Sequence, residues 1–325
     1  MSDSMIISDA QRMAQRTKFL NKDTVVGVTC VPFSGGQPKG GVEDGPVEMV
    51  RFGILDQIKA MGYTVELSAG MDKYAAKPPS DPPVGKLKNA RYVSTAALRV
   101  RDQVHAHCKE RRMCVTLGGD HSIAMGTLSG TAAVYGDSLC VVWVDAHADI
   151  NTPETTESGN LHGCPLSFLL GLCEAHEPFE WITPKLRKDR LVYIGLRDVD
   201  AGEKALLRKH GIKAFSMHDV DKHGIGRVVE MALDHVNRDR ALPVHMSFDV
   251  DALDPSVAPA TGTPVRGGLT FREGHYICEA VAETGCLVAL DLVEVNPALG
   301  DPASLRQTVA VGCSLVRCSL GETLL

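Results

Sequence analysis

Three short clusters of histidine and aspartate residues in this 325-residue sequence have types and spacings that could hold metal ions. Side chains at positions i and i+2 of an extended segment point the same way, so Asp145 can face the same point as His147, and Asp249 the same point as Asp251. A lone Asp-x-Asp pair is usually a turn or a helix cap. Three clusters with compatible spacing indicate one shared site, and they are Gly118-Gly119-Asp120-His121, Asp145-Ala146-His147-Ala148-Asp149 and Asp249-Val250-Asp251.

The charge of these clusters predicts which ions they would hold. Carboxylates that converge in a pocket of low dielectric raise one another's pKa strongly, so four aspartates need cations beside them. Two divalent ions would balance the four carboxylates. Mixed imidazole and carboxylate ligands favour Mn²⁺, Co²⁺ or Fe²⁺ over Mg²⁺, which prefers oxygen ligands and water. We therefore expect a binuclear site, and activation of water is the chemistry that such a site supplies.

Buried strands must position these clusters. Short runs rich in Val, Ile and Leu recur at wide intervals, as expected for strands buried on both faces of a sheet. The metal-ligating clusters follow three of the runs, and Glu294 follows a fourth. In open parallel sheets, ligands bind just outside the carboxyl ends of the strands, so these side chains should meet at one edge. The expected strands are Val25–Thr29, Met113–Leu117, Leu139–Val144, Leu191–Ile194, Val244–Phe248 and Leu287–Leu292.

Segments with helical periodicity lie between the runs, and this alternation predicts βαβ crossovers and a mostly parallel sheet. Two polar stretches, Ser68–Lys88 and Asn151–Gly163, lack periodicity and are expected to be loops. Neither a repeat nor a linker divides the chain. We expect an α/β fold with a single domain over residues 23–325, preceded by a flexible N-terminal extension over residues 1–22. The expected helices are Thr95–Arg112, Gly202–Gly211, Gly226–Asn237, Phe271–Thr284 and Ser304–Leu320.

Composition limits the classes of partner. The net charge is −6 and no block rich in Lys or Arg stands out, so nothing favours nucleic acid or a membrane as a partner. No apolar run approaches the roughly 20 residues that span a bilayer, and the first residues make a poor signal peptide. Ten cysteines without CxxC spacing favour buried thiols over disulfides. We expect a cytoplasmic protein, with an organelle reached through the N-terminal extension as the alternative.

Longer stretches around the three clusters resemble the signature motifs of the ureohydrolase family, and within it those of the arginases. They are Gly118–Ser122, Val144–Asp149 and Ser247–Asp251, and the resemblance extends from Pro32–Gln37 to Gly321–Thr323. It implies a three-layer α/β/α fold and a homotrimer. It also implies a hydrolase that converts L-arginine to L-ornithine and urea, in which a hydroxide between two Mn²⁺ ions attacks the guanidinium carbon.

The resemblance assigns a role to each metal-ligating residue. One Mn²⁺ ion would be held by His121, Asp145, Asp149 and Asp249. The other would be held by Asp145, His147, Asp249 and Asp251. Asp145 and Asp249 would therefore bridge the two ions.

Three residues would carry the reaction itself if the resemblance holds. Asp149 would also move a proton from the attacking hydroxide to the leaving amine. Glu294 would pair with the guanidinium and orient it. His162, in a glycine-rich loop, matches the family's proton-shuttle histidine, and imidazole is suited to that task because it titrates near neutral pH.

The polar loop after Asp149 resembles the arginase segment that receives the amino-acid end of the substrate. Uncharged donors for the α-carboxylate are reasonable there, because a fixed cation would repel the guanidinium. The expected donors are Asn151, Ser158, Asn160 nearby and, as a further possibility, Thr155. Asp200 and Glu203 would hold the α-ammonium directly or through water, and Thr263 would lie near the metal ions.

Three other interpretations are left open at this point. An agmatinase or a guanidino-acid hydrolase would share the metal cage and differ in the loop, although Asn151, Ser158 and Glu203 favour an α-amino acid. A metal-free binding subunit is disfavoured because every expected ligand is present. A dinuclear phosphoesterase or deacetylase is disfavoured by Glu294 and by the length of the motifs.

Overall fold

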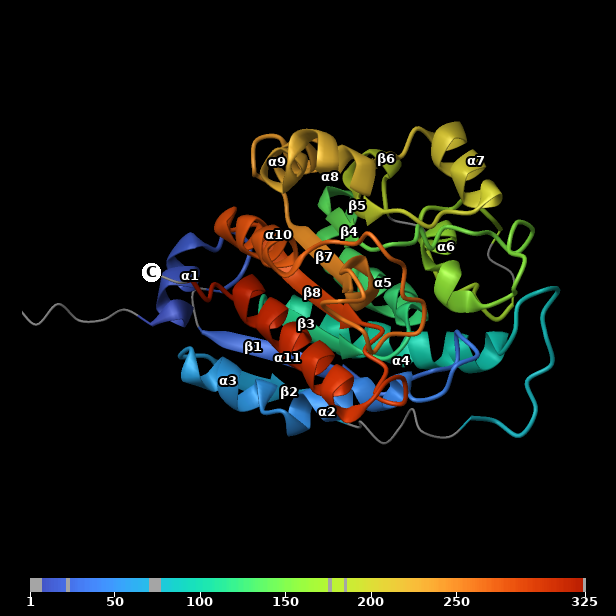
Figure 1. Ribbon diagram of the computed structural model, residues 1–325, viewed down its shortest axis with the longest axis horizontal. Helices are drawn as coiled ribbons and strands as arrows, with labels where there is room; N and C mark the ends of the chain where they lie inside the picture. Colours follow the sequence, from blue (N-terminus) through green and yellow to red (C-terminus); the bar gives the residue numbers. More distant parts are fainter. Residues whose placement is uncertain (1–7, 22–23, 70–76, 175–176, 184–185, 324–325) are drawn as a thin grey trace, which may run out of the picture.

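The computed structural model describes residues 8–21, 24–69, 77–174, 177–183 and 186–323 (Figure 1). Within these residues, eight parallel strands form one sheet in the order β2-β1-β3-β8-β7-β4-β5-β6. All six strands expected from apolar runs are present. The strands are β1 (Val25–Val31), β2 (Thr64–Leu67), β3 (Met113–Gly118), β4 (Cys140–Val144), β5 (Leu191–Leu196), β6 (Lys213–Ser216), β7 (Val244–Asp249) and β8 (Leu287–Val293).

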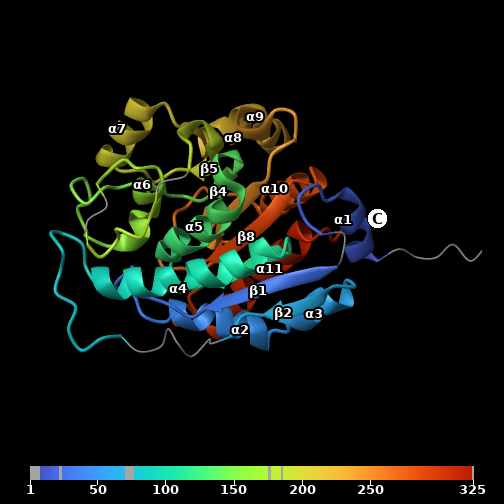
Figure 2. The same ribbon diagram turned by 180° about the vertical axis from the view of Figure 1, so that it is seen from behind.

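Helices cover both faces of the sheet, which gives three layers. Figure 1 shows α10 and α11 across one face, and Figure 2 shows α4 and α5 across the other. The expected helices correspond to α4, α7, α9, α10 and α11. The helices are α1 (Asp9–Arg16), α2 (Gly45–Arg51), α3 (Ile54–Ala60), α4 (Ala90–Lys109), α5 (Ala124–Tyr135), α6 (Pro165–Leu169), α7 (Ala201–His210), α8 (Met217–His223), α9 (Ile225–Asn237), α10 (Phe271–Glu283) and α11 (Pro302–Ser319).

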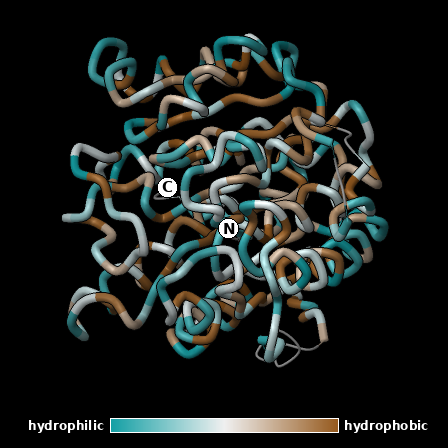
Figure 3. The backbone as a smooth tube through the Cα atoms, turned by 90° about the vertical axis from the view of Figure 1, so that its right-hand side faces the viewer, coloured by the Kyte–Doolittle hydropathy of each residue, from teal (hydrophilic) through white to brown (hydrophobic). Residues whose placement is uncertain are grey.

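Each face of the sheet has its own apolar core. Alternate strand residues such as Val142 and Met246 pack with α9, α10 and α11. Their neighbours, Trp143 among them, pack on the opposite side with α4, α5 and α6. The coloured tube shows hydrophobic segments gathered inside and largely hydrophilic turns outside (Figure 3). None of the described helices combines the length and apolar character that a membrane-spanning segment requires.

The N-terminal helix α1 packs against the rest of the domain. Ser8 caps it through a capping box with Gln11, and Met13 is buried in the core beside Gly321. After the helix, Lys18 Nζ donates a hydrogen bond to the Arg240 carbonyl at 2.7 Å. Residues 8–21 therefore belong to the packed domain, which differs from the flexible extension expected over residues 1–22. The remaining residues of that extension, 1–7 and 22, lie outside the described residues.

Candidate metal centre

The expected metal ligands meet at the carboxyl edge of four neighbouring strands. Strands β3, β8, β7 and β4 lie side by side in the sheet, although they are far apart in the sequence. His121 follows β3, Asp145 follows β4, and Asp249 ends β7. The parallel topology therefore assembles the three clusters as the sequence predicts.

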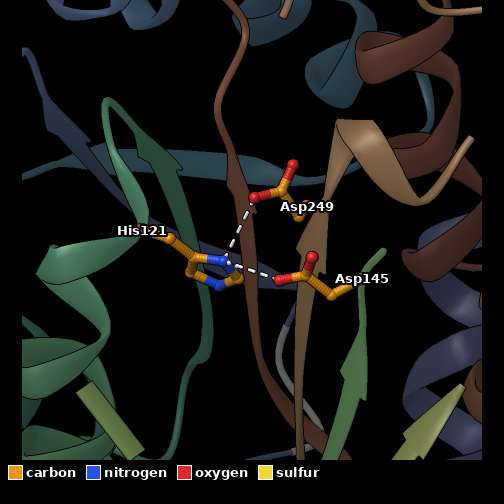
Figure 4. Close-up of side chains that lie close together, drawn as sticks. All are labelled: His121, Asp145 and Asp249. Carbon is orange, nitrogen blue, oxygen red and sulfur yellow. Dashed lines mark ion pairs between the residues drawn. The ribbon is translucent and has the colours of Figure 1, made fainter. Parts of the chain in front are cut away.

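The ligand atoms form two groups that share Asp145. The Nδ1 atom of His121 lies 3.1 Å from Asp145 Oδ2 and 3.2 Å from Asp249 Oδ2 (Figure 4). It also lies 3.2 Å from Asp149 Oδ2. The Nδ1 atom of His147 lies 3.4 Å from Asp145 Oδ1 and 3.0 Å from Asp251 Oδ2. Asp145 thus directs one carboxylate oxygen to each histidine, which is the arrangement that a bridging ligand needs.

The environment of these groups favours positive charge. Burial alone would lower the pKa of His121, but three carboxylates around it outweigh burial and raise that pKa well above its usual range. Burial, Asp251 and Asp145 together raise the pKa of Asp249. In addition, His121 Nδ1 is buried without a hydrogen-bond partner. A buried ring nitrogen that faces crowded carboxylates fits a metal cation, and each of the two groups could hold one.

Backbone amides fix the carboxylates in place. The His147 amide donates to Asp145 Oδ1 at 2.7 Å, and the Asp251 amide donates to Asp249 Oδ1 at 2.8 Å. Thr263 Oγ1 donates to Asp251 Oδ2 at 2.8 Å, so this residue does contact the cage. Asp249 keeps Oδ2, the atom that faces His121, free of these hydrogen bonds. Asp145 and Asp251 accept them on oxygen atoms that also face His147, and each of those oxygen atoms has a second lone pair for a metal.

Two residues that the sequence analysis did not single out support His121. The ring of Trp143 stacks on the imidazole with centroids 4.0 Å apart and planes 9° apart, and Trp143 Nε1 donates to Asp145 Oδ2 at 2.9 Å. Ser247 Oγ lies 2.9 Å from His121 Nε2. Both residues precede a ligand by two positions on a strand and so share its face. That spacing indicates the shared face, but it does not show that the two side chains contact His121.

Glu294 and His162 lie together beside the cage. Glu294 Oε1 accepts a hydrogen bond from the His121 amide at 2.8 Å and lies 3.5 Å from His162 Nδ1. Burial alone would lower the pKa of His162, but Glu294, Asp149 and Asp120 outweigh it and raise that pKa to about 9. Asp149 and Glu294 both have positive φ angles, 49° and 65°, which are uncommon for residues other than glycine.

Most residues expected to bind the amino-acid end form one hydrogen-bond network. Asn151 Nδ2 donates to Asp200 Oδ2 at 2.6 Å, and Thr155 Oγ1 donates to Asn151 Oδ1 at 2.7 Å. Asp200 and Glu203 form the capping box of α7. Burial and Asp149 raise the pKa of Glu203 to about 8.

Ser158 and Asn160 lie outside that network, on the polar loop. Ser158 is exposed, and its Oγ accepts a hydrogen bond from the Asn160 amide at 3.2 Å. Asn160 lines a cavity of about 540 Å³ together with Gln37 and Lys88. None of the expected metal ligands lines this cavity, and neither do Asn151, Asp200 and Glu294.

Comparison with known proteins decides the family. A sequence model described as "Arginase family" matches residues 24–321. The chain belongs to the arginase family. The arginase of Glaciozyma antarctica (strain PI12) is 59% identical over 98% of this chain and 94% of its own length.

Solved arginase structures share the fold. The crystal structure of a cold-adapted arginase from Glaciozyma antarctica superposes with a TM-score of 0.78 at 53% identity, covering 95% of this chain and 98% of that one. The Entamoeba histolytica arginase in complex with L-ornithine superposes with a TM-score of 0.82 at 28% identity, covering 94% and 100%. The three-layer α/β fold expected for an arginase is confirmed.

Proposed function

We propose that this arginase-family chain hydrolyses L-arginine to L-ornithine and urea with two Mn²⁺ ions per subunit. The observation that carries the proposal is the convergence of two histidines and four aspartates from three strand ends, with Asp145 shared between two ligand groups. Glu294 beside this cage supplies a carboxylate for a guanidinium. The ornithine-bound arginase of Entamoeba histolytica supports the identity of the product.

The reaction adds water to the guanidinium carbon and breaks its bond to the δ-nitrogen of ornithine. When bound, the ions supply a water molecule whose pKa falls from about 15.7 toward 7, so that it becomes nucleophilic at neutral pH. Glu294 pairs with the guanidinium and holds its carbon in front of the cage. Asp149 Oδ2 takes the proton that the attacking water gives up and passes it to the leaving nitrogen. His162 then exchanges protons between the site and solvent.

The other end of the substrate determines which guanidine is accepted. Asn151, Ser158 and Asn160 donate hydrogen bonds to the α-carboxylate. Asp200 and Glu203 hold the α-ammonium, since their side chains belong to one network at the start of α7. An amine without a carboxylate, such as agmatine, leaves the first group of donors unpaired, which disfavours its binding.

We also propose a homotrimer in the cytoplasm. Membership of the arginase family supports the trimer. All ten cysteines are free thiols and nine are buried, which suits a reducing compartment. Light scattering of the purified protein tests the trimer, and a stable monomer at micromolar concentration would contradict it.

Urea release measured from L-arginine and from agmatine tests the proposed activity. The protein is stripped with EDTA, reloaded with Mn²⁺ and assayed with each substrate. We expect urea and ornithine in equal amounts from arginine, and activity that depends on Mn²⁺. Faster urea release from agmatine would show that agmatine is the preferred substrate. No release from either compound would refute the proposal.

A further inference from the structure

A column of buried polar side chains continues from the metal centre into the sheet. His245 and Ser247 precede Asp249 on β7 at intervals of two, so all three share one face. Asp291 on the neighbouring strand β8 is in register with Ser247. His245, Ser247 and Asp291 are each 0% exposed. Burying a carboxylate in the centre of a sheet is costly unless it is paired, and the proposed reaction gives neither Asp291 nor His245 a role.

Helix α5 fixes the orientation of His245. Thr131 Oγ1 donates its proton to the Thr127 carbonyl at 3.0 Å. Because that hydroxyl has no second proton, His245 Nδ1, 3.1 Å away, must be the donor to Thr131 Oγ1. The other ring nitrogen, Nε2, then lies 3.0 Å from Asp291 Oδ2. His245 is therefore held with Nε2 facing the buried carboxylate of Asp291, which also accepts a hydrogen bond from Thr127 Oγ1 at 2.6 Å.

Asp291 in turn fixes the direction of the hydrogen bond between Ser247 and His121. A carboxylate can only accept, so Ser247 Oγ, 3.3 Å from Asp291 Oδ2, gives its proton to that oxygen. Ser247 Oγ must then accept from His121 Nε2, 2.9 Å away. A metal at His121 Nδ1 requires the lone pair there, so the one remaining ring proton must be on Nε2 and needs such an acceptor.

We propose that Asp291, paired with His245, is a positioning residue that acts through Ser247 to hold His121 in the tautomer able to bind a metal ion. The inference rests on the proposed metal site. It adds to that site a residue, Asp291, that reaches the metal-ligating His121 only through Ser247. Partners that hydrogen-bond to a metal ligand typically change metal affinity 10–100-fold. We expect a loss of about tenfold for Asp291, because it acts through one intervening hydroxyl.

Mn²⁺ titrations followed by tryptophan fluorescence test the proposal without measuring activity. The chain has two tryptophans, and Trp143 stacks on His121, so Trp181→Phe leaves a single reporter at the site. In this background we compare Asp291→Asn, Ser247→Ala and the double variant. Asparagine keeps the shape of aspartate, but its amide can donate a hydrogen bond to Ser247. The hydrogen bonds from His121 through Ser247 to residue 291 could then run in the opposite direction.

The double variant separates a positioning role from a general structural one. We expect Asp291→Asn to raise the Kd for Mn²⁺ about tenfold, and Ser247→Ala 10–100-fold. Adding Asp291→Asn to Ser247→Ala should raise the Kd no further, because the link to His121 is already cut. An unchanged Kd for Asp291→Asn, or the same increase in both backgrounds, would overturn the proposal.

Two controls keep the outcomes distinct. Thr29→Val, on β1, removes a buried hydroxyl that forms a hydrogen bond with Ser68 and none with the metal-ligating residues. It should lower Tm with no change in the Kd for Mn²⁺. If Asp291→Asn does not fold, His245→Asn is used instead, because it keeps a donor to Thr131 and removes the ring nitrogen that faces Asp291. It should likewise raise the Kd only when Ser247 is present. Failure of the parent protein to bind Mn²⁺ would refute the proposed function itself. Tight binding with a Kd that Asp291→Asn does not change would refute only this inference.

Discussion

Gly119 lies directly against the backbone of Phe33, just before the first metal-ligating cluster. The Gly119 amide donates to the Val31 carbonyl at 2.9 Å, and the Asp120 amide donates to the Phe33 carbonyl at 2.9 Å. A Cβ atom at Gly119 would collide with the Phe33 carbonyl oxygen. The chain after β3 can therefore follow this path only without a side chain.

Gly119→Ala is expected to destabilise the fold by about 3 kcal/mol or more, since backbone atoms cannot give way as a flexible side chain can. Differential scanning fluorimetry would record a decrease in Tm on the order of 10 °C. Gly40→Ala is the matched control, because a Cβ there meets no atom within 4 Å. Equal Tm values for the two variants would show that the close approach does not constrain the fold.

Asp249→Ala is expected to remove at least one Mn²⁺ per subunit and nearly all turnover, because Asp249 is one of the proposed bridging carboxylates. Mass spectrometry of metal content after reloading measures the first effect, and urea release measures the second. The exposed Asp221→Ala on α8 serves as the control and should keep both metals. Parent-like manganese content in Asp249→Ala contradicts the ligand assignment.

His162→Asn is expected to keep both metals and to lower kcat about a hundredfold, since a positioned acid or base typically contributes 10²–10⁴-fold. We expect this loss because His162 Nδ1 lies 3.5 Å from Glu294, the residue proposed to pair with the guanidinium. Steady-state kinetics and metal analysis on one preparation separate the two effects. The exposed His223→Asn controls for loss of an imidazole, and unaltered kcat in His162→Asn rules out a shuttle at this residue.

Ser158→Ala is expected to raise KM for L-arginine several-fold while leaving kcat nearly unchanged, because one hydrogen bond to a charged group contributes about 1.5 kcal/mol. The same variant should leave KM for agmatine unaffected, since agmatine lacks the α-carboxylate. Ser80→Ala, at another exposed loop position, is the control. Equal effects on both substrates would place Ser158 outside the carboxylate-binding group.

The central part of the fold could be predicted from the sequence because buried parallel strands are nearly continuous apolar runs. The two edge strands, β2 and β6, were missed: each has four residues, most of them exposed or partly exposed, so neither forms such a run. Helix α5 was missed for the opposite reason. It is apolar around most of its circumference, with buried residues from Ala124 to Ala132, and so it lacks helical periodicity.

The metal-ligating residues could be predicted because their types, spacing and strand ends all indicate one chemistry. The supporting residues could not, since Trp143 and Ser247 are ordinary members of buried strands until their neighbours are known. Asp291 was hidden in the same way, within the run Leu287–Leu292. Its partners come from α5 and β7, and no local pattern in the sequence connects those elements.

The order of strands in the sheet determines when the metal cage can exist. Its ligands follow β3, β4 and β7, and β8 separates β3 from β7 in the sheet although it is the last strand in the sequence. A nascent chain that has not yet made β8 therefore has a gap in the middle of its sheet and no complete cage. Pairing between such distant segments is slow, so we expect metal binding to be a late step in maturation, one that requires the whole domain to have formed.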